Sequence, residues 1–336
     1  MVADITLHTL TNVPKVDQIV REIISLVEDR FCDRIRGYYL VGSYAVGEAV
    51  VTSDLDMVVV FKGSFEPEEK QPFAQVLSKC NRISPLAVDL TPVGETMLFR
   101  IGGVRFQTAS LLMYGEDIRA AVPKKPVENH IRETMHDQYR LLARVRGNPP
   151  ILRFPLDYPD PAGEFYGYDC RLMRTPDGVS HPGIKDLVLN VLCPAEALIL
   201  LKAGKYVGNG KKSECGTQYR IWINDEWTAF VEAIDEYCRK RWAYLVPEER
   251  AHRQQLRSLC ERALEFENHF LVQYKEYLLA QLGQVEPFIQ LHYVKRLGQL
   301  IYPDEAIVTA LHDLGNSSNP EIRQAVAETL QRYTKD

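Results

Sequence analysis

Two aspartates one residue apart, Asp54 and Asp56, are the side chains of this sequence best placed to do chemistry. They begin an apolar, β-branched run that ends at Phe61, which is typical of a strand. In a strand, residues i and i+2 face the same side, about 6.6 Å apart, so both carboxylates project together while Leu55 and Met57 enter the core. Two such carboxylates repel each other unless a cation lies between them. The pair therefore predicts a divalent-metal site.

The ligand chemistry indicates which ion is expected. Oxygen donors with no histidine or cysteine nearby suit Mg²⁺ and not Zn²⁺. A third carboxylate, Asp89, lies in the middle of an alternating run at residues 86–93. An acidic residue among core-forming residues is unusual and indicates a specific role. If that run pairs beside the strand at 54–61, Asp89 faces the same point. We expect Asp54, Asp56 and Asp89 to be both the metal ligands and the catalytic residues, holding two Mg²⁺ ions.

A glycine-serine turn, Gly42-Ser43, follows another short strand at residues 37–41 and precedes the aspartate pair. Gly42 lets the backbone approach a phosphate closely, and the Ser43 hydroxyl and the turn amides can donate hydrogen bonds to phosphate oxygens. Ser53, directly before the first aspartate, joins them as a nucleotide-binding candidate. The assembly predicts a nucleoside triphosphate clamped by metal for in-line attack at its α-phosphorus. An Asp-x-Asp pair alone is often a solvated turn, but this conjunction is far rarer.

A second group of candidates is basic: Lys205, Lys211 and Lys212 lie in and beside the sequence VGNGKKS. This turn is not a P-loop, because its glycines and lysines do not have the G-x-x-x-x-G-K-S/T spacing that a P-loop requires. Its lysines still offer mobile positive charge to a triphosphate, so all three are nucleotide-binding candidates. The alternative interpretation is an ordinary solvated turn between two helices, and the sequence does not choose among the lysines.

The elements that must position these residues are predicted to be a small mixed sheet followed by helices. Residues 15–31 place apolar side chains at three- and four-residue steps, which predicts an amphipathic helix leading into the first strand. The segment 111–123 is predicted to be the end of a helix and its exit, and a Pro-Lys-Lys-Pro run marks a boundary there. From residue 184 onward helical periods dominate. The sequence therefore predicts an α+β fold.

These motifs resemble a known family. Gly42-Ser43, Asp54-Leu55-Asp56 and Asp89 together resemble the signature of the polymerase-β-type nucleotidyltransferase superfamily. The segment 111–123, LLMYGEDIRAAVP, is similar to the one that closes the catalytic domain in small bacterial members. The stretch 193–215, CPAEALILLKAGKYVGNGKKSEC, resembles the helical domain of the aminoglycoside (streptomycin/spectinomycin) adenylyltransferases.

The resemblance implies transfer of AMP from MgATP to a hydroxyl, with release of pyrophosphate. Asp54 and Asp56 would bind Mg²⁺, and Asp89 would be a third ligand or the base that takes the acceptor proton; the aminoglycoside enzymes have glutamate at this third position. In that family the basic turn reaches across the domain cleft to the triphosphate, so Lys211 or Lys212 would neutralise the departing pyrophosphate.

The resemblance and the acidic balance favour a small cationic acceptor, as in antibiotic resistance by aminoglycoside modification. Two alternatives stay open: a protein or tRNA acceptor, as in toxin-antitoxin relatives, and a scaffold that binds nucleotide without turnover. The acceptor pocket is expected between the domains. Its candidate lining residues are aromatic or acidic: Tyr166, Tyr168, Asp169, Trp222, Asp225, Glu226 and Trp227.

Composition sets the remaining expectations. The 336 residues are 46% hydrophobic, enough for a full core, and the formal net charge of −5 disfavours a broad nucleic-acid or membrane surface. With no signal-like start, no bilayer-length apolar run and seven scattered cysteines, we expect a cytoplasmic protein, of oligomeric state left open. The expected parts are a nucleotidyltransferase domain (1–123), a linker helix and arm (124–183), a helical domain (184–285) and a helical tail (286–336).

Overall fold

The computed structural model describes residues 5–207, 210–283 and 286–333, and its contacts divide the chain into two compact units. Each unit gathers several stretches of the chain. The first comprises Met1–Arg132, Arg171–Lys185 and Ile199–Val246, and the second comprises Glu133–Cys170, Asp186–Leu198 and Pro247–Asp336. The boundaries expected at residues 123, 183 and 285 stay a prediction, and the compact units divide the chain at other points.

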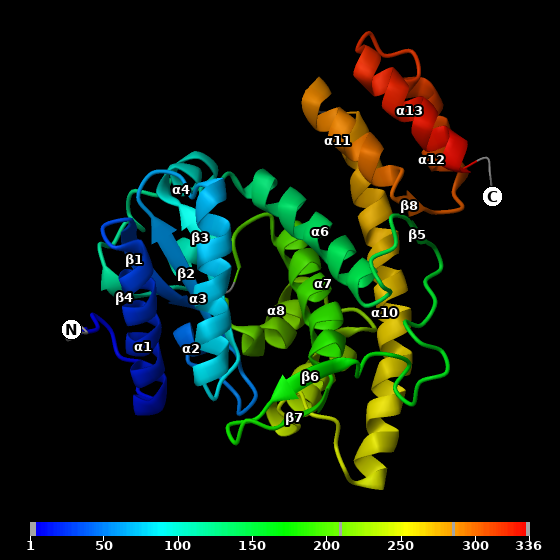
Figure 1. Cartoon of the computed structure of the whole chain (residues 1–336). Helices are drawn as coiled ribbons and strands as arrows, with labels where there is room; N and C mark the ends of the chain where they lie inside the picture. The colour runs from blue at the N-terminus through cyan, green and yellow to red at the C-terminus, as the bar shows by residue number, and fades with distance from the viewer. Residues whose placement is uncertain (1–4, 208–209, 284–285, 334–336) are drawn as a thin grey trace. The chain divides into compact units, whose positions relative to one another are not determined.

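The first unit is built on a four-stranded mixed sheet (Figure 1). Two of its neighbouring strands run parallel, and the other two pairs are antiparallel. In the order in which they lie side by side, the strands are β3 (Val88–Gly94), β2 (Leu55–Phe61), β1 (Ile35–Val41) and β4 (Leu111–Gly115). The strands predicted at 37–41, 54–61 and 86–93 are confirmed as β1, β2 and β3, and they are neighbours as expected.

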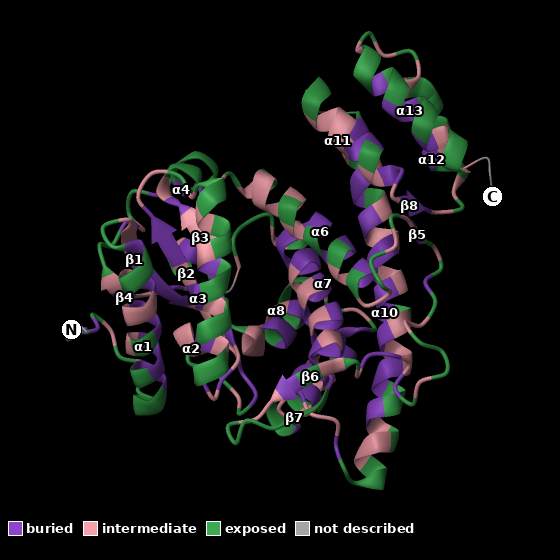
Figure 2. Ribbon diagram, in the orientation of Figure 1, coloured by how far each residue is buried: buried purple, intermediate pink, exposed green. Residues whose placement is uncertain are grey.

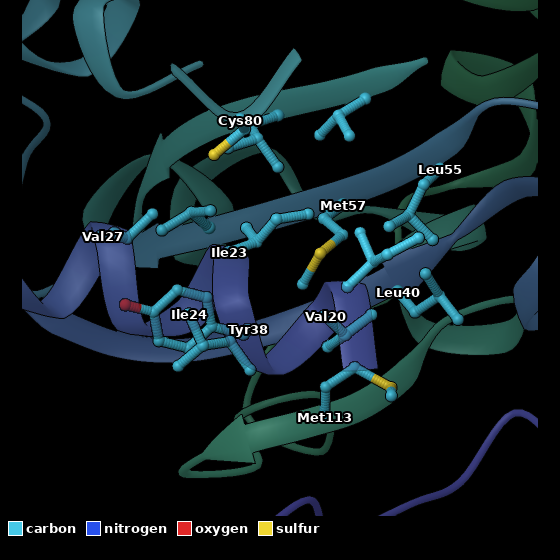
Figure 3. Close-up of a cluster of buried hydrophobic side chains, with 14 of the residues drawn as sticks. Val20, Ile23, Ile24, Val27, Tyr38, Leu40, Leu55, Met57, Cys80 and Met113 are labelled. Atoms are coloured by element: carbon cyan, nitrogen blue, oxygen red, sulfur yellow. The ribbon is translucent and has the colours of Figure 1, made fainter. Parts of the chain in front are cut away.

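Two helices, α1 (Pro14–Phe31) and α3 (Lys70–Ile83), cover one face of this sheet (Figure 1). The predicted helix at 15–31 is confirmed as α1, whose apolar stripe packs on the strands. Figure 3 shows Val20 and Ile23 of α1 beside Leu40 and Met57 of the sheet. These four side chains are at most 1% exposed, so this face forms a dry core beneath β2.

The opposite face of the sheet carries a smaller core. Tyr39 and Val60 pack there with Leu98 of α4 (Glu95–Ile101) and Phe106 of α5 (Val104–Thr108). Alternation along β2 explains the division, because successive side chains of a strand point to opposite faces. Acidic residues of β2 and β3 on this second face are therefore held clear of the larger core.

The prediction that 111–123 ends a helix is wrong. Its first part is β4, which pairs antiparallel with β1 and places Met113 at 0% exposure in the core. The exit is then fixed by Tyr39, whose hydroxyl donates to the Glu116 carbonyl at 2.8 Å and accepts from the Ile118 amide at 2.9 Å. This segment therefore forms an edge strand of the sheet and the exit that follows it, and not the end of a helix.

The first unit also contains two short helical turns within the sheet region, a hairpin, and further helices that follow the hairpin in sequence. These elements are α2 (Gly42–Ala45), η1 (Pro67–Glu69), β6 (Arg171–Arg174), β7 (Ser180–Gly183), the start of α7 (Lys185–Ala203), η2 (Lys212–Glu214), α8 (Cys215–Trp222), α9 (Thr228–Ala233) and the π-helical η3 (Ile234–Arg241).

The second unit is mainly helical, and buried residues recur along its longest helix, as the ribbon coloured by burial shows (Figure 2). Asn319 caps the last helix of this unit, since its Oδ1 accepts the Glu321 amide at 2.9 Å. The elements of the second unit are α6 (Val127–Arg144, which starts in the first unit), β5 (Leu152–Arg153), most of α7, α10 (Arg250–Leu282), α11 (Pro287–Leu297), β8 (Leu300–Ile301), α12 (Glu305–Leu314) and α13 (Pro320–Tyr333).

A buried carboxylate organises the middle of α10. Glu267 is 0% exposed and accepts hydrogen bonds from Arg146 at 2.5 Å, Tyr168 at 2.9 Å and Asn190 at 3.0 Å. These partners satisfy a charge that would otherwise be costly to bury.

The predicted α+β fold, with a small mixed sheet followed by a largely helical portion, is confirmed. Across the described stretches of the chain, no helix combines the length and apolar character that crossing a membrane requires.

Candidate active site

Asp54, Asp56 and Asp89 meet at one end of the parallel strand pair. Asp54 directly precedes β2, Asp56 is its second residue, and Asp89 is the second residue of β3. The register places Asp56 opposite Asp89, so both side chains leave the same face of the sheet. This is the arrangement that the sequence predicts for the third acid.

Gly42 lies directly against this cluster. Its φ is +70°, and a Cβ atom built on it would lie 2.4 Å from Oδ2 of Asp56. A side chain at this position would therefore both strain the backbone and displace the carboxylate. The turn after β1 and Asp56 of β2 are thus in direct contact.

The two serines of the motif have different surroundings. Ser53 is buried, and its hydroxyl accepts a hydrogen bond from the Val50 amide at 2.9 Å. That bond shapes the turn before Asp54, so Ser53 has a structural partner in addition to its predicted place near the nucleotide. Ser43 lies in the single helical turn α2, and its carbonyl accepts the Glu48 amide at 2.8 Å.

Burial and the neighbouring charges shift the pKa values of Asp54 and Asp56 in opposite directions. Burial, followed by the charges of Asp54 and Asp89, raises the pKa of Asp56 to about 7, although Lys185 and Lys212 oppose the rise. Burial also acts to raise the pKa of Asp54, but the ammonium of Lys185 outweighs it and the pKa falls below its usual value. Asp54 is therefore ionised at neutral pH, whereas Asp56 exchanges its proton near pH 7.

Lys185, the first residue of α7, is a site residue that the sequence analysis does not include. Its Nζ donates to both carboxylate oxygens of Asp54, at 2.7 and 2.6 Å. A lysine in the first turn of a helix opposes the helix dipole, and this one is also buried. The helix position can be read from the sequence, but the burial that indicates a nearby anion is seen only in the structure.

Arg171, the first residue of β6, is a second cation that the sequence analysis does not include. Its charge helps to lower the pKa of Asp54. No local pattern marks it, because its effect on Asp54 depends on where the hairpin of β6 and β7 lies.

The three lysines in and beside the basic turn have different surroundings. Lys212 lies close enough to Asp56 for its charge to lower that pKa, whereas Nζ of Lys205 lies 4.7 Å from the centre of the Trp222 ring. Lys211 is exposed and precedes η2. Gly208 and Asn209 of the same turn lie outside the described residues.

Glu48 ties this basic turn to the loop between β1 and β2. Its carboxylate accepts hydrogen bonds from the backbone amide of Ser213 at 3.3 Å and from the Ser213 hydroxyl. Arg239 donates to the same carboxylate at 2.7 Å. The residue after Lys212 is thereby held beside the loop that carries Gly42.

Several of the residues expected to line an acceptor pocket have structural partners. Tyr168 is fully buried and bonds to Glu267, and Tyr166 stacks on Tyr158 with ring centres 4.1 Å apart. Asp225 accepts a hydrogen bond from the Trp227 amide at 2.9 Å, which shapes the start of α9. Their predicted role in binding an acceptor stays a prediction.

The donor set of the three acids suits a hard divalent ion. All the donors are carboxylate oxygens, and a cation would relieve the repulsion that raises the pKa of Asp56. In the described ranges, no three acidic, histidine or cysteine side chains already surround a point in the geometry of a metal site. Both oxygens of Asp54 instead bind the ammonium of Lys185.

Comparison with known proteins agrees with this geometry. Residues 14–104, which include all three acids, match the sequence model of the family described as "Nucleotidyltransferase domain". No curated protein sequence matches the chain.

Two solved structures are similar to parts of the chain. One is the spectinomycin adenyltransferase AAD(9) from Enterococcus faecialis, solved with ATP and spectinomycin: 13% identity, 74% of this chain and 98% of that chain covered, and a TM-score of 0.45. Another is a toxin-antitoxin structure with AMP-PNP, at 19% identity, covering 38% of this chain and 94% of that chain, with a TM-score of 0.24.

Proposed function

We propose that this chain, whose residues 14–104 match the nucleotidyltransferase-domain family, moves AMP from ATP to a hydroxyl of a small cationic acceptor, releasing pyrophosphate. The observation that carries the proposal is the meeting of three carboxylates, on adjacent strands, with the Gly42 turn. Lys185, Arg171 and Lys212 lie around the same acids and add the positive charge that a triphosphate needs.

Asp54 and Asp56 would hold Mg²⁺ in this reaction. A bound divalent ion would neutralise phosphate charge and align the triphosphate for in-line displacement. Gly42 lets the Asp56 carboxylate lie against the turn after β1, because a side chain at that position would displace it.

The chemical step is a displacement at the α-phosphorus. The acceptor oxygen forms a bond to this atom, the bond from the α-phosphorus to the bridging oxygen breaks, and the electron pair leaves with pyrophosphate. Asp89 is the proposed base for the hydroxyl proton, because it is exposed at the strand end, whereas Asp54 is held by Lys185.

The basic turn would act on the leaving group. Lys212 lies near Asp56, and Glu48 holds the adjacent Ser213 in place. A fixed ammonium there would stabilise the charge that develops on pyrophosphate. Lys212 is therefore preferred over Lys205 and Lys211 for this role.

The proposed acceptor class rests on charge and resemblance. The chain carries a net charge of −5, which favours a cationic small molecule, and residues 193–215 resemble the corresponding stretch of aminoglycoside adenylyltransferases. A protein or tRNA acceptor is the alternative.

Incubation with ATP labelled at the α-phosphate tests the acceptor. The reaction would contain Mg²⁺ and, in separate arms, aminoglycosides, total tRNA, or protein alone, with a chelator as the control. We expect Mg²⁺-dependent label on a small-molecule product. Label retained on tRNA or protein would reject the small acceptor while preserving nucleotidyl transfer, and nucleotide binding without turnover in any arm would favour the scaffold alternative.

A further inference from the structure

The pairing of Lys185 with Asp54 places a lysine ammonium on an acid proposed to bind metal. Nζ lies within 2.7 Å of both carboxylate oxygens, so the ammonium occupies the bidentate face of Asp54. The Lys185 side chain is 11% exposed and that of Asp54 is 25% exposed. The contact is thus a shielded ion pair at the centre of the candidate site, and solvent screening weakens it little.

The neighbouring charges favour the ion pair between Lys185 and Asp54 when no other cation is bound. Asp56 and Asp89 add negative charge beside Asp54, and Arg171 adds positive charge. A cation on Asp54 reduces the repulsion within the cluster whether that cation is an ammonium or a metal ion. The two cannot both take the same two oxygens at bonding distance.

Resting on the proposed function, we propose that Lys185 is a positioning residue whose ammonium competes with the divalent ion for Asp54. It keeps the acid cluster assembled before substrate arrives. The ion must displace it, and the incoming triphosphate supplies the anion that the released ammonium needs.

This arrangement makes ion and nucleotide binding cooperative. Without nucleotide, a released Lys185 would be a buried charge without its anionic partner, which is unfavourable. With a triphosphate present, that cost is removed, so each ligand favours the other. Lys185 thereby discourages occupation of the site by a metal ion alone.

The test is Mn²⁺ binding to the full chain, measured from the electron paramagnetic resonance signal of the free ion, without nucleotide. We expect Lys185→Met to bind Mn²⁺ at least about tenfold more tightly than the unmodified protein, because the competitor is gone. Lys202→Met is the matched control, since Lys202 is an exposed lysine of the same helix, and it should change the affinity less than about threefold. An unchanged or weaker affinity in Lys185→Met would overturn the proposal.

Lys185→Arg gives a second reading that preserves the charge. A guanidinium binds a carboxylate through two parallel hydrogen bonds, so it should compete more strongly and weaken Mn²⁺ binding without nucleotide. Adding a non-hydrolysable ATP analogue should tighten Mn²⁺ binding more in the unmodified protein than in Lys185→Met. Equal tightening in both would argue that Lys185 is merely structural. Because no turnover is measured, these outcomes are independent of whether AMP transfer is found.

Discussion

The carboxylate of Glu48 lies 2.7 Å from the guanidinium of Arg239, and both side chains are shielded, at 11% and 4% exposure. Arg239 also binds Asp235 at 2.9 Å from within the π-helical stretch η3. Through this contact the loop that carries Gly42 is joined to the helical part of the first unit. The same carboxylate binds Ser213, next to Lys212.

Glu48→Gln should therefore affect both stability and nucleotide use. It removes one charge of a buried pair, and we expect a loss of about 1–3 kcal/mol in the free energy of unfolding. Loosening of the Lys212 turn should raise the KM for ATP several-fold. Urea unfolding and steady-state kinetics measure these effects. Glu116→Gln is the control, because Glu116 is 68% exposed in its pair with Arg36; if it were as costly, burial would not be the cause.

Gly42→Ala should damage the site by displacing Asp56. The added Cβ would lie 2.4 Å from the carboxylate, so we expect about a hundredfold loss of transfer rate. Gly47→Ala is a matched control in the same loop, since Gly47 has φ +74° but no atom within 4 Å of an added Cβ. Both variants should lose about 1 kcal/mol from backbone strain. Equal activity losses would show that strain, and not contact with Asp56, is responsible.

Asp56→Asn should stabilise the metal-free protein at alkaline pH. Burial and neighbouring acids raise the pKa of Asp56 to about 7, well above its value of about 4 in an unfolded chain. Its contribution to stability is therefore present below about pH 4 and is lost as the pH rises through 7. In chelator at pH 8 we expect the variant to be more stable by about 1–3 kcal/mol, allowing for partial screening. Thermal unfolding that shows no gain would contradict the predicted repulsion.

His136 should make the second unit sensitive to acid. Burial, with the charges of Arg296 and Arg140, lowers its pKa to about 3, and its Nε2 has no hydrogen-bond partner among the described residues. Because the unfolded chain takes up a proton near pH 6.5, stability is full above that pH and falls, by up to about 1.4 kcal/mol per unit, as the pH drops toward 3.

His136→Gln should flatten this dependence in urea unfolding measured between pH 7 and 4. It should also lower stability at pH 7 by about 1 kcal/mol, because the 2.7 Å contact of Nδ1 with the Tyr274 hydroxyl is lost. His312→Gln, at an exposed position, should keep the original slope. A slope that survives in His136→Gln would assign the acid sensitivity to other groups.

Short-range patterns were enough to predict the sheet and its acids. The periodicity of α1 and the β-branched runs of β1 and β2 are local properties, and each element formed where its pattern lies. The facing of Asp56 and Asp89 follows from strand alternation once β2 and β3 are neighbours. The strand β4 lacks a clear alternation, and its pairing with β1 depends on a partner far earlier in the sequence.

The cations of the site depend on long-range contacts that no local pattern encodes. Lys185 is 131 positions from Asp54 in sequence, and Arg171 comes from a separate hairpin. The basic turn was visible as composition, but its lysines differ only through what they meet: Trp222 for Lys205 and the acid cluster for Lys212.

Pyrophosphate release from ATP, followed as Mg²⁺ is added, tests the role of the three acids most directly. Asp54→Asn, Asp56→Asn and Asp89→Asn keep the size of each side chain and remove its charge. Asp33→Asn is the control, because Asp33 is exposed and has a φ of 63°, which asparagine also adopts. We expect each of the three site variants to lose at least about a hundredfold of the Mg²⁺-dependent rate, with Asp33→Asn unchanged. Full activity in any one of the three would contradict the account.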